Sequence, residues 1–155
     1  SSAPAGQNLH LLHWRAHSRP PDGGAIRRRG DRIPGRRVHG GVLLVSCLLH
    51  DAYRYWLLAD TGAAQTILTP TVAAEIGLDL RVPLRYERMA SVHRVVRVPV
   101  VRVQSLQVGA QRLTDVEVLV LAFPPELHVD GLLGVNVLGR FRATFEFDRA
   151  TLVLR

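Results

Sequence analysis

The sequence contains no lysine and a single cysteine, and none of its apolar runs is long. All twenty basic residues are arginine, which indicates a coding bias, because phosphate recognition would not exclude lysine. Cys47 alone cannot form an internal disulfide or a cysteine-cluster metal site, and its apolar neighbours predict a small core residue rather than a nucleophile. No apolar run approaches the roughly 20 residues that a membrane-spanning helix needs.

The 155 residues are enough for one domain with a substantial core, because 47% of them are hydrophobic. The chain begins at Ser1 rather than Met, so a preceding signal or membrane anchor would not be visible in it. The sequence therefore leaves the cellular compartment unknown.

The formal charge of +7 is concentrated near the N-terminus. Residues 1–37 hold eight arginines against two acids, for a net +6, whereas residues 38–155 hold twelve arginines against eleven acids, for +1. Residues 1–36 are also rich in Pro, Gly and Ser, so we expect a mobile or loosely docked basic arm followed by a main domain over residues 37–155. The arginine run could contact nucleic acid or an anionic membrane, but a solvated linker fits this composition better.

Metal-ligand residues are sparse. His10, His13 and His17 could share one helical face in the arm, but they have no nearby Asp, Glu or Cys partners. We therefore predict no metal site and no other cofactor.

The main domain shows mainly strand patterns. Apolar or alternating runs predict strands over residues 38–49, 53–60, 66–69, 80–88, 94–103, 113–122, 141–147 and 151–154. Thr69-Pro70-Thr71 predicts the start of a short helix that runs to Ile76, and a second helical turn is expected over residues 135–140. The fold class is therefore all-β with one or two short helices.

Asp60 is the most informative position. It ends the apolar run from Trp56 to Ala59 and precedes Thr61 and Gly62, a pattern that suits an acid at the end of a buried strand followed by a tight turn. A partly desolvated carboxylate there would have a proton affinity set by its neighbours. Asp-Thr-Gly is also ordinary turn chemistry, so these three residues alone do not distinguish a site from a turn.

The order of motifs resembles the retropepsin-like aspartic proteases, the single-domain class of retroviral proteases and their cellular and bacterial relatives. The resemblance covers roughly residues 38–155, and it implies a small closed β barrel with a flap hairpin around residues 88–94. It rests on L-L-A-D-T-G-A-A-Q-T-I-L from residue 57, T-P-T-V-A-A-E-I-G-L from residue 69, D-G-L-L-G-V-N-V-L from residue 130 and F-E-F-D-R-A-T-L-V-L from residue 145.

The resemblance also implies a function, namely an aspartic endopeptidase that activates water between two Asp carboxylates. The chain has only one Asp-Thr-Gly, so the second carboxylate would be Asp60 of another copy in a two-fold homodimer. Thr61 would hydrogen-bond across the dimer, and the Gly62 backbone would orient the carboxylates and an extended peptide substrate. Asp130, which precedes Gly131, is expected to be a structural turn residue rather than a second catalytic acid.

The remaining implied site residues are Ala63 as active-site support and, as substrate contacts, Thr66, Ser91, Val92, Leu133 and Gly134. Two features depart from the retroviral pattern. Ala64 and Val135 stand where an acid and an arginine commonly pair to brace the dimer, and the flap tip, residues 89–93, contains no glycine. The alternative function is therefore a non-catalytic module that uses this fold for dimerisation or peptide binding.

Overall fold

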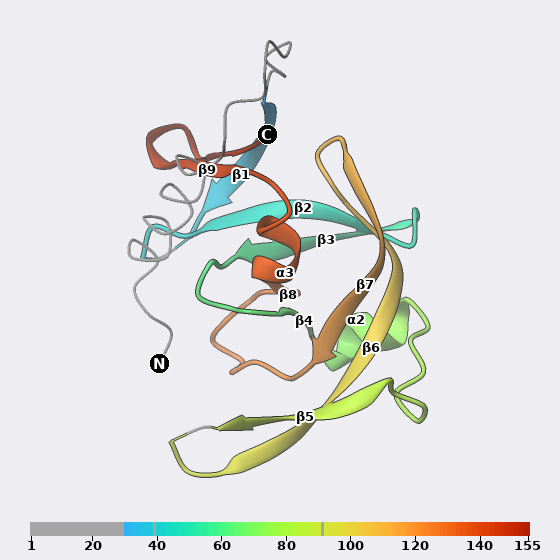
Figure 1. Cartoon of the computed structure of the whole chain (residues 1–155). Coiled ribbons are helices and arrows are strands. Elements are labelled where there is room, and N and C mark those ends of the chain that lie inside the picture. The colour runs from blue at the N-terminus through green and yellow to red at the C-terminus, as the bar shows by residue number, and fades with distance from the viewer. Residues whose placement is uncertain (1–29, 39, 91) are drawn as a thin grey trace.

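The computed structural model describes residues 30–38, 40–90 and 92–155, which form mainly β-strands (Figure 1). The helices are α2 (Pro70–Glu75) and α3 (Val135–Leu138), and a 3-10 turn, η1 (Phe147–Arg149), precedes the last strand. The strands are β1 (Asp31–Arg37), β2 (Leu43–Leu49), β3 (Tyr53–Ala59), β4 (Thr66–Leu68), β5 (Arg85–Ala90), β6 (Val95–Val108), β7 (Gln111–Val120), β8 (Gly131–Leu133), β9 (Ala143–Glu146) and β10 (Thr151–Leu154).

Some predictions fall on residues that lie outside the described ranges. These are the arm over residues 1–29, with its three histidines, and Ser91. Within the described ranges, no helix has the length and apolar character needed to cross a membrane.

Six strands close into a barrel, as the resemblance implies. Their hydrogen-bonded order is β2, β3, β8, β4, β7 and β6, and β6 returns to β2 through pairs such as Cys47 with Val108. Fully buried aliphatic side chains fill the interior, among them Leu43, Val45, Leu49, Leu57, Val103, Leu106, Val116, Val118 and Leu133. The expected mostly-β fold is confirmed.

A tight turn joins the first two predicted barrel strands, and the predicted start of the first helix is capped. β2 and β3 pair antiparallel around His50 and Asp51, whose φ values of 52° and 59° complete the tight turn. The Thr69 hydroxyl caps α2 by accepting a hydrogen bond from Val72 N (3.3 Å). β6 extends past its predicted end at residue 103, because its last residues pair with both β7 and β2.

The boundary expected after residue 36 falls inside strand β1. Residues 31–34 pair with β10 and residues 35–37 pair with β2, so β1 joins the β9–β10 hairpin to the barrel. The change of partner occurs at Gly35, where a Cβ would lie 2.7 Å from the carbonyl oxygen of Leu44. Ile33 is only 5% exposed and packs in the main core. This segment is therefore part of the folded domain.

The flap hairpin, defined here as β5 with residues 95–100 of β6, extends from the barrel at the end opposite β9 and the C-terminus (Figure 1). On one face of this hairpin Glu87 lies opposite Val98, and Met89 lies opposite Val96. That face packs on a second apolar cluster, the flap cluster. Its buried members are Ile67, Val98, Val100 and Leu119, and partly buried Met89, Val96, Leu121, Phe123 and Leu132 pack against them.

Candidate active site

Asp60 is the first residue after β3, where β3 runs parallel to β8. The pairing of Ala59 with Leu133 continues into a hydrogen bond from Asp60 N to Leu133 O (3.0 Å). The Asp60 side chain is half-buried, and its Oδ1 accepts a hydrogen bond from Gly62 N (2.8 Å). Thr61 is half-buried and Gly62 is exposed in the same turn. In the described part of the chain no hydrogen bond occupies Oδ2, so that oxygen is available to a proton or a water.

The loop that carries Asp60 is held against the start of α3. Ala63 O accepts a hydrogen bond from Val135 N (2.8 Å), and Ala64 O accepts one from Asn136 N (3.1 Å). Gly134 makes this close approach feasible, because a Cβ there would lie 2.5 Å from backbone atoms of Gln65. Two of the four sequence elements that carry the resemblance, those starting at residues 57 and 130, are therefore in direct contact.

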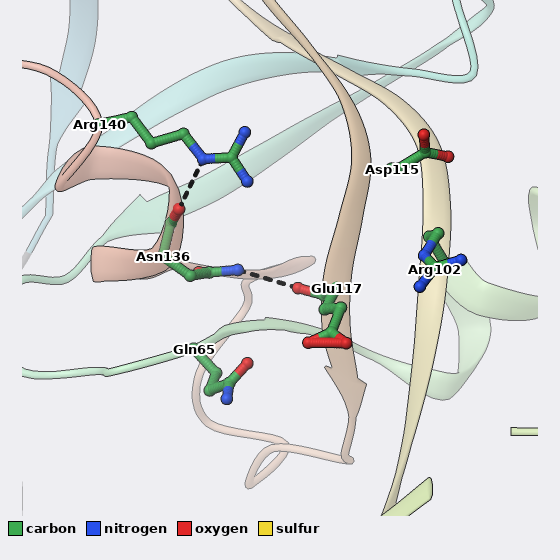
Figure 2. Close-up of a pocket in the computed structure, with 6 residues that line it drawn as sticks. All are labelled: Gln65, Arg102, Asp115, Glu117, Asn136 and Arg140. Atoms are coloured by element: carbon green, nitrogen blue, oxygen red, sulfur yellow. Dashed lines mark hydrogen bonds between the residues drawn. The ribbon is translucent and has the colours of Figure 1, made fainter. Parts of the chain in front are cut away.

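A largely part-buried hydrogen-bond network connects this contact to the barrel. The Thr66 hydroxyl accepts a hydrogen bond from Gly134 N (3.1 Å) and donates one to Asn136 Oδ1 (2.8 Å). Asn136 Oδ1 also accepts from Thr66 N (2.8 Å), and Asn136 Nδ2 donates to Glu117 O in β7 (2.9 Å; Figure 2). Asn136 is not among the predicted site residues. Its signal in the sequence is a single polar residue within an otherwise apolar V-N-V-L run.

Replacing Thr66 with valine should destabilise the protein by about 1–3 kcal/mol, because the buried Gly134 N–H would lose its acceptor. Chemical denaturation measures this change as a lower midpoint at unchanged slope. Thr114→Val, on an exposed position of β7, is the matched control and should shift the free energy of unfolding by less than about 0.5 kcal/mol. Equal stability of the two variants would show that the network does not contribute to the free energy of unfolding.

Five of the predicted site residues, Ala63 as active-site support and four as substrate contacts, divide into three groups. Ala63 and Gly134 lie beside Asp60, whereas Val92 is 90% exposed near the flap tip. Thr66 and Leu133 are 0% exposed, and their side chains face the protein interior. Both are buried in this structure, so contact of Thr66 and Leu133 with a peptide stays a prediction.

Leu132, unlike Leu133, is not enclosed in the main core. Successive side chains of a strand point to opposite faces, so Leu132 leaves the core and packs against the flap cluster with Ile67. It is half-buried, as is Met89 on the facing side of the flap hairpin. The alternation of side chains along Leu132-Leu133 is the sequence signal for the position of Leu132 outside the main core.

Two other side chains with reactive groups, Cys47 and Asp130, have structural roles. Cys47 is 0% exposed, and burial raises the pKa of its thiol to about 12, so no thiolate forms near neutral pH. Asp130 Oδ2 accepts a hydrogen bond from Trp56 N (3.0 Å), which ties the turn before β8 to β3. Across the described residues, no group of three or more His, Cys, Asp or Glu side chains could hold a metal.

A polar cavity of about 540 Å³ adjoins the Asp60 loop (Figure 2), lined by Gln65, Arg102, Asp115, Glu117, Asn136 and Arg140. Arg85 binds Glu117 on its wall through Nη1 to Oε1 (2.8 Å) and Nη2 to Oε2 (3.1 Å). This hydrogen bonding lowers the pKa of the Glu117 carboxyl. The lining has two arginines and two acids, so its charges favour neither an anionic nor a cationic ligand.

Known proteins share both the sequence pattern and the architecture. Residues 47–140 match the family described as "gag-polyprotein putative aspartyl protease". The crystal structure of a retropepsin-like aspartic protease from Rickettsia conorii is similar, with a TM-score of 0.63 and 22% sequence identity, over 81% of this chain and 90% of that chain. No curated protein matches the sequence. The matched family segment contains both Asp60 and Gly134.

Proposed function

Because the chain belongs to the retropepsin-like aspartyl protease family, we propose that it is an aspartic endopeptidase whose catalytic pair consists of Asp60 from each of two copies. The observation that supports this most directly is the position of Asp60. One carboxylate oxygen is oriented by Gly62 N, and Oδ2 is left for a proton or water. The alternative acid within one chain, Asp130, already binds the β3 backbone.

Two carboxylates are needed because each performs a different task. Like charges a few ångströms apart cannot both ionise, so such a pair shares one proton and offers a base and an acid together. A two-fold axis brings the same residue of both copies together without any further motif. A single Asp-Thr-Gly per chain agrees with this arrangement.

The proposed reaction proceeds in two steps. The ionised carboxylate takes a proton from a bound water while the water oxygen attacks the scissile carbonyl carbon, and the protonated partner gives its proton to the carbonyl oxygen. The resulting diol then returns a proton to the ionised carboxylate as the C–N bond breaks, and the carboxyl that took the proton from water gives it to the leaving nitrogen. The products are a carboxylic acid and an amine, and the pair again holds one proton. Thr61 would support the pair across the dimer.

The proposed substrate is an extended peptide held between the flap hairpin and the barrel. Such peptides pair through main-chain hydrogen bonds and place alternate side chains in pockets. The half-buried Leu132 and Met89 of the flap cluster would receive apolar side chains next to the scissile bond. Closure of the flap over the peptide would exclude water from the carboxylates.

Digestion of a peptide library over a pH series, with the cut sites identified by mass spectrometry, tests this function. We expect internal cleavage with apolar residues beside the cut bond. The alternative, a non-catalytic dimerisation or peptide-binding module, is favoured by the missing charge pair at Ala64 and Val135. A protein that forms dimers but cleaves nothing at any pH would support that alternative.

Dilution should lower the activity of each chain, because a lone subunit holds half of the site. Once most dimers have dissociated, each tenfold dilution should reduce specific activity about tenfold. Stopped assays across a concentration series measure this, and sedimentation velocity gives the dimer fraction in the same buffer. Constant specific activity in samples shown to be monomeric would exclude a shared site.

A further inference from the structure

Arg85, at the start of β5, connects the flap hairpin to the barrel. Its guanidinium makes the two bonds to Glu117 given above and a third, from Nη2 to Glu87 Oε1 (2.9 Å). Glu87 belongs to the flap hairpin, whereas Glu117 belongs to β7, which is separated from β5 by β6. The Arg85 side chain therefore crosses one strand to hold two carboxylates from different parts of the fold.

These carboxylates lie next to the loop that carries Asp60. Gln65 Nε2, in that loop, donates to Glu87 Oε1 at 3.5 Å. From the barrel side, the backbone oxygen of Glu117 accepts from Asn136 Nδ2, as Figure 2 shows. Arg85 thus touches both a flap residue and the strand that anchors α3 beside the site.

We propose that Arg85 is a positioning residue that latches the flap hairpin over the Asp60 loop, an inference that rests on the protease function proposed above. A planar guanidinium group binds a carboxylate through two hydrogen bonds in a fixed geometry, which a lysine cannot reproduce. Without Arg85, Glu87 and Glu117 would face each other as like charges. That repulsion would weaken the contact of β5 with the barrel, which the pairing of β6 with β7 would still hold.

The latch acts on binding more than on chemistry. A closed flap contacts the peptide in the ground state and in the transition state alike, and loss of such an interaction raises KM while kcat stays the same. The Arg85 side chain is 43% exposed, so water weakens the contact. We expect Arg85→Gln to raise KM about fivefold, in keeping with partly exposed ion pairs, and to change kcat by less than about twofold.

Hydrogen exchange tests the latch independently of activity. Amides of residues 85–100 should exchange about fivefold faster in Arg85→Gln than in the wild type, because the hairpin opens more often. Glu117→Gln weakens the same contact from the barrel side without leaving two like charges, so it should have a smaller effect in the same direction, and Arg85→Lys should also give an intermediate one.

Arg112→Gln is the matched control. Arg112 also binds one carboxylate through two hydrogen bonds, from Nε and Nη2 to Asp51 (2.9 and 2.8 Å), and has similar exposure, but it lies away from the flap. It should change neither flap exchange nor KM. Flap exchange in Arg85→Gln equal to that of Arg112→Gln would overturn the latch, even if peptide cleavage is confirmed. Faster flap exchange without any cleavage by the wild type would keep the latch and reject the protease function.

Discussion

Replacing Asp60 with asparagine should abolish peptide hydrolysis while leaving the fold intact. Asparagine can still accept the hydrogen bond from Gly62 N, so the turn geometry is retained, but it can neither take a proton from water nor share one with its partner. Loss of this acid–base function should lower kcat by on the order of 10³-fold. Steady-state cleavage of a library-derived peptide measures the loss, and thermal unfolding checks the fold.

Asp130→Asn is the matched control, because Asp130, in the turn before β8, is the other acid that the sequence offers beside a glycine of the motif. It accepts a hydrogen bond from Trp56 N, which asparagine also accepts, so cleavage should persist. Residual cleavage by Asp60→Asn at the wild-type rate would reject the catalytic assignment. Loss of cleavage in Asp130→Asn with the fold preserved would point to a pair within one chain.

Mixing the two proteins tests whether the site is shared. Heterodimers of wild type and Asp60→Asn would hold one carboxylate. With equal amounts, free exchange of subunits and nearly all chains dimeric, mass action leaves about half of the wild-type activity. Unchanged activity in a mixture whose subunits have exchanged would mean that one chain supplies both acids.

The features that could be predicted from the sequence are those with local causes. Thr69-Pro70 sets the start of α2 through a cap within one turn, and His50-Asp51 sets the β2–β3 turn. The abrupt end of the apolar run at Asp60 places this residue at the end of β3, where the structure has it. Each of these signals involves residues that are close in the chain, so composition and spacing suffice.

The features that were not predicted depend on distant partners. β1 is stabilised by pairing with β10, more than 100 residues away, and its arginines obscure the strand pattern. Asn136 bonds Thr66 and Glu117, neither of which is near it in sequence. The prediction for Leu133 treated the residues of the motif alike. Burial instead alternates along the strand, so that Leu133 lies in the main core and Leu132 points away from it. Membership of a motif therefore does not establish contact with substrate.

Replacing Gly134 with alanine should damage both stability and activity. The added Cβ would lie 2.5 Å from the carbonyl carbon and oxygen of Gln65 and 2.9 Å from Ala63 O, all of them backbone atoms. The loop must move away, which breaks the bonds from Val135 N and Asn136 N. We expect a loss of about 3 kcal/mol in the free energy of unfolding, at the upper end for overpacking. A shift of about 1 Å at Asp60 should cost roughly 100-fold in kcat.

Gly77→Ala separates crowding from backbone strain. Gly77 has a φ of 79° and nothing within 4 Å of an added Cβ, so alanine there should cost about 1 kcal/mol through its left-handed conformation alone. Gly134 has a φ of −96°, which alanine adopts freely, so its larger cost must come from contact with the Asp60 loop. Denaturation and peptide cleavage of both variants show whether contact with the Asp60 loop causes the larger cost at Gly134. If Gly134→Ala is as stable as Gly77→Ala and cleaves normally, the loop is not held by this contact, and Asp60 must be positioned by β3 alone.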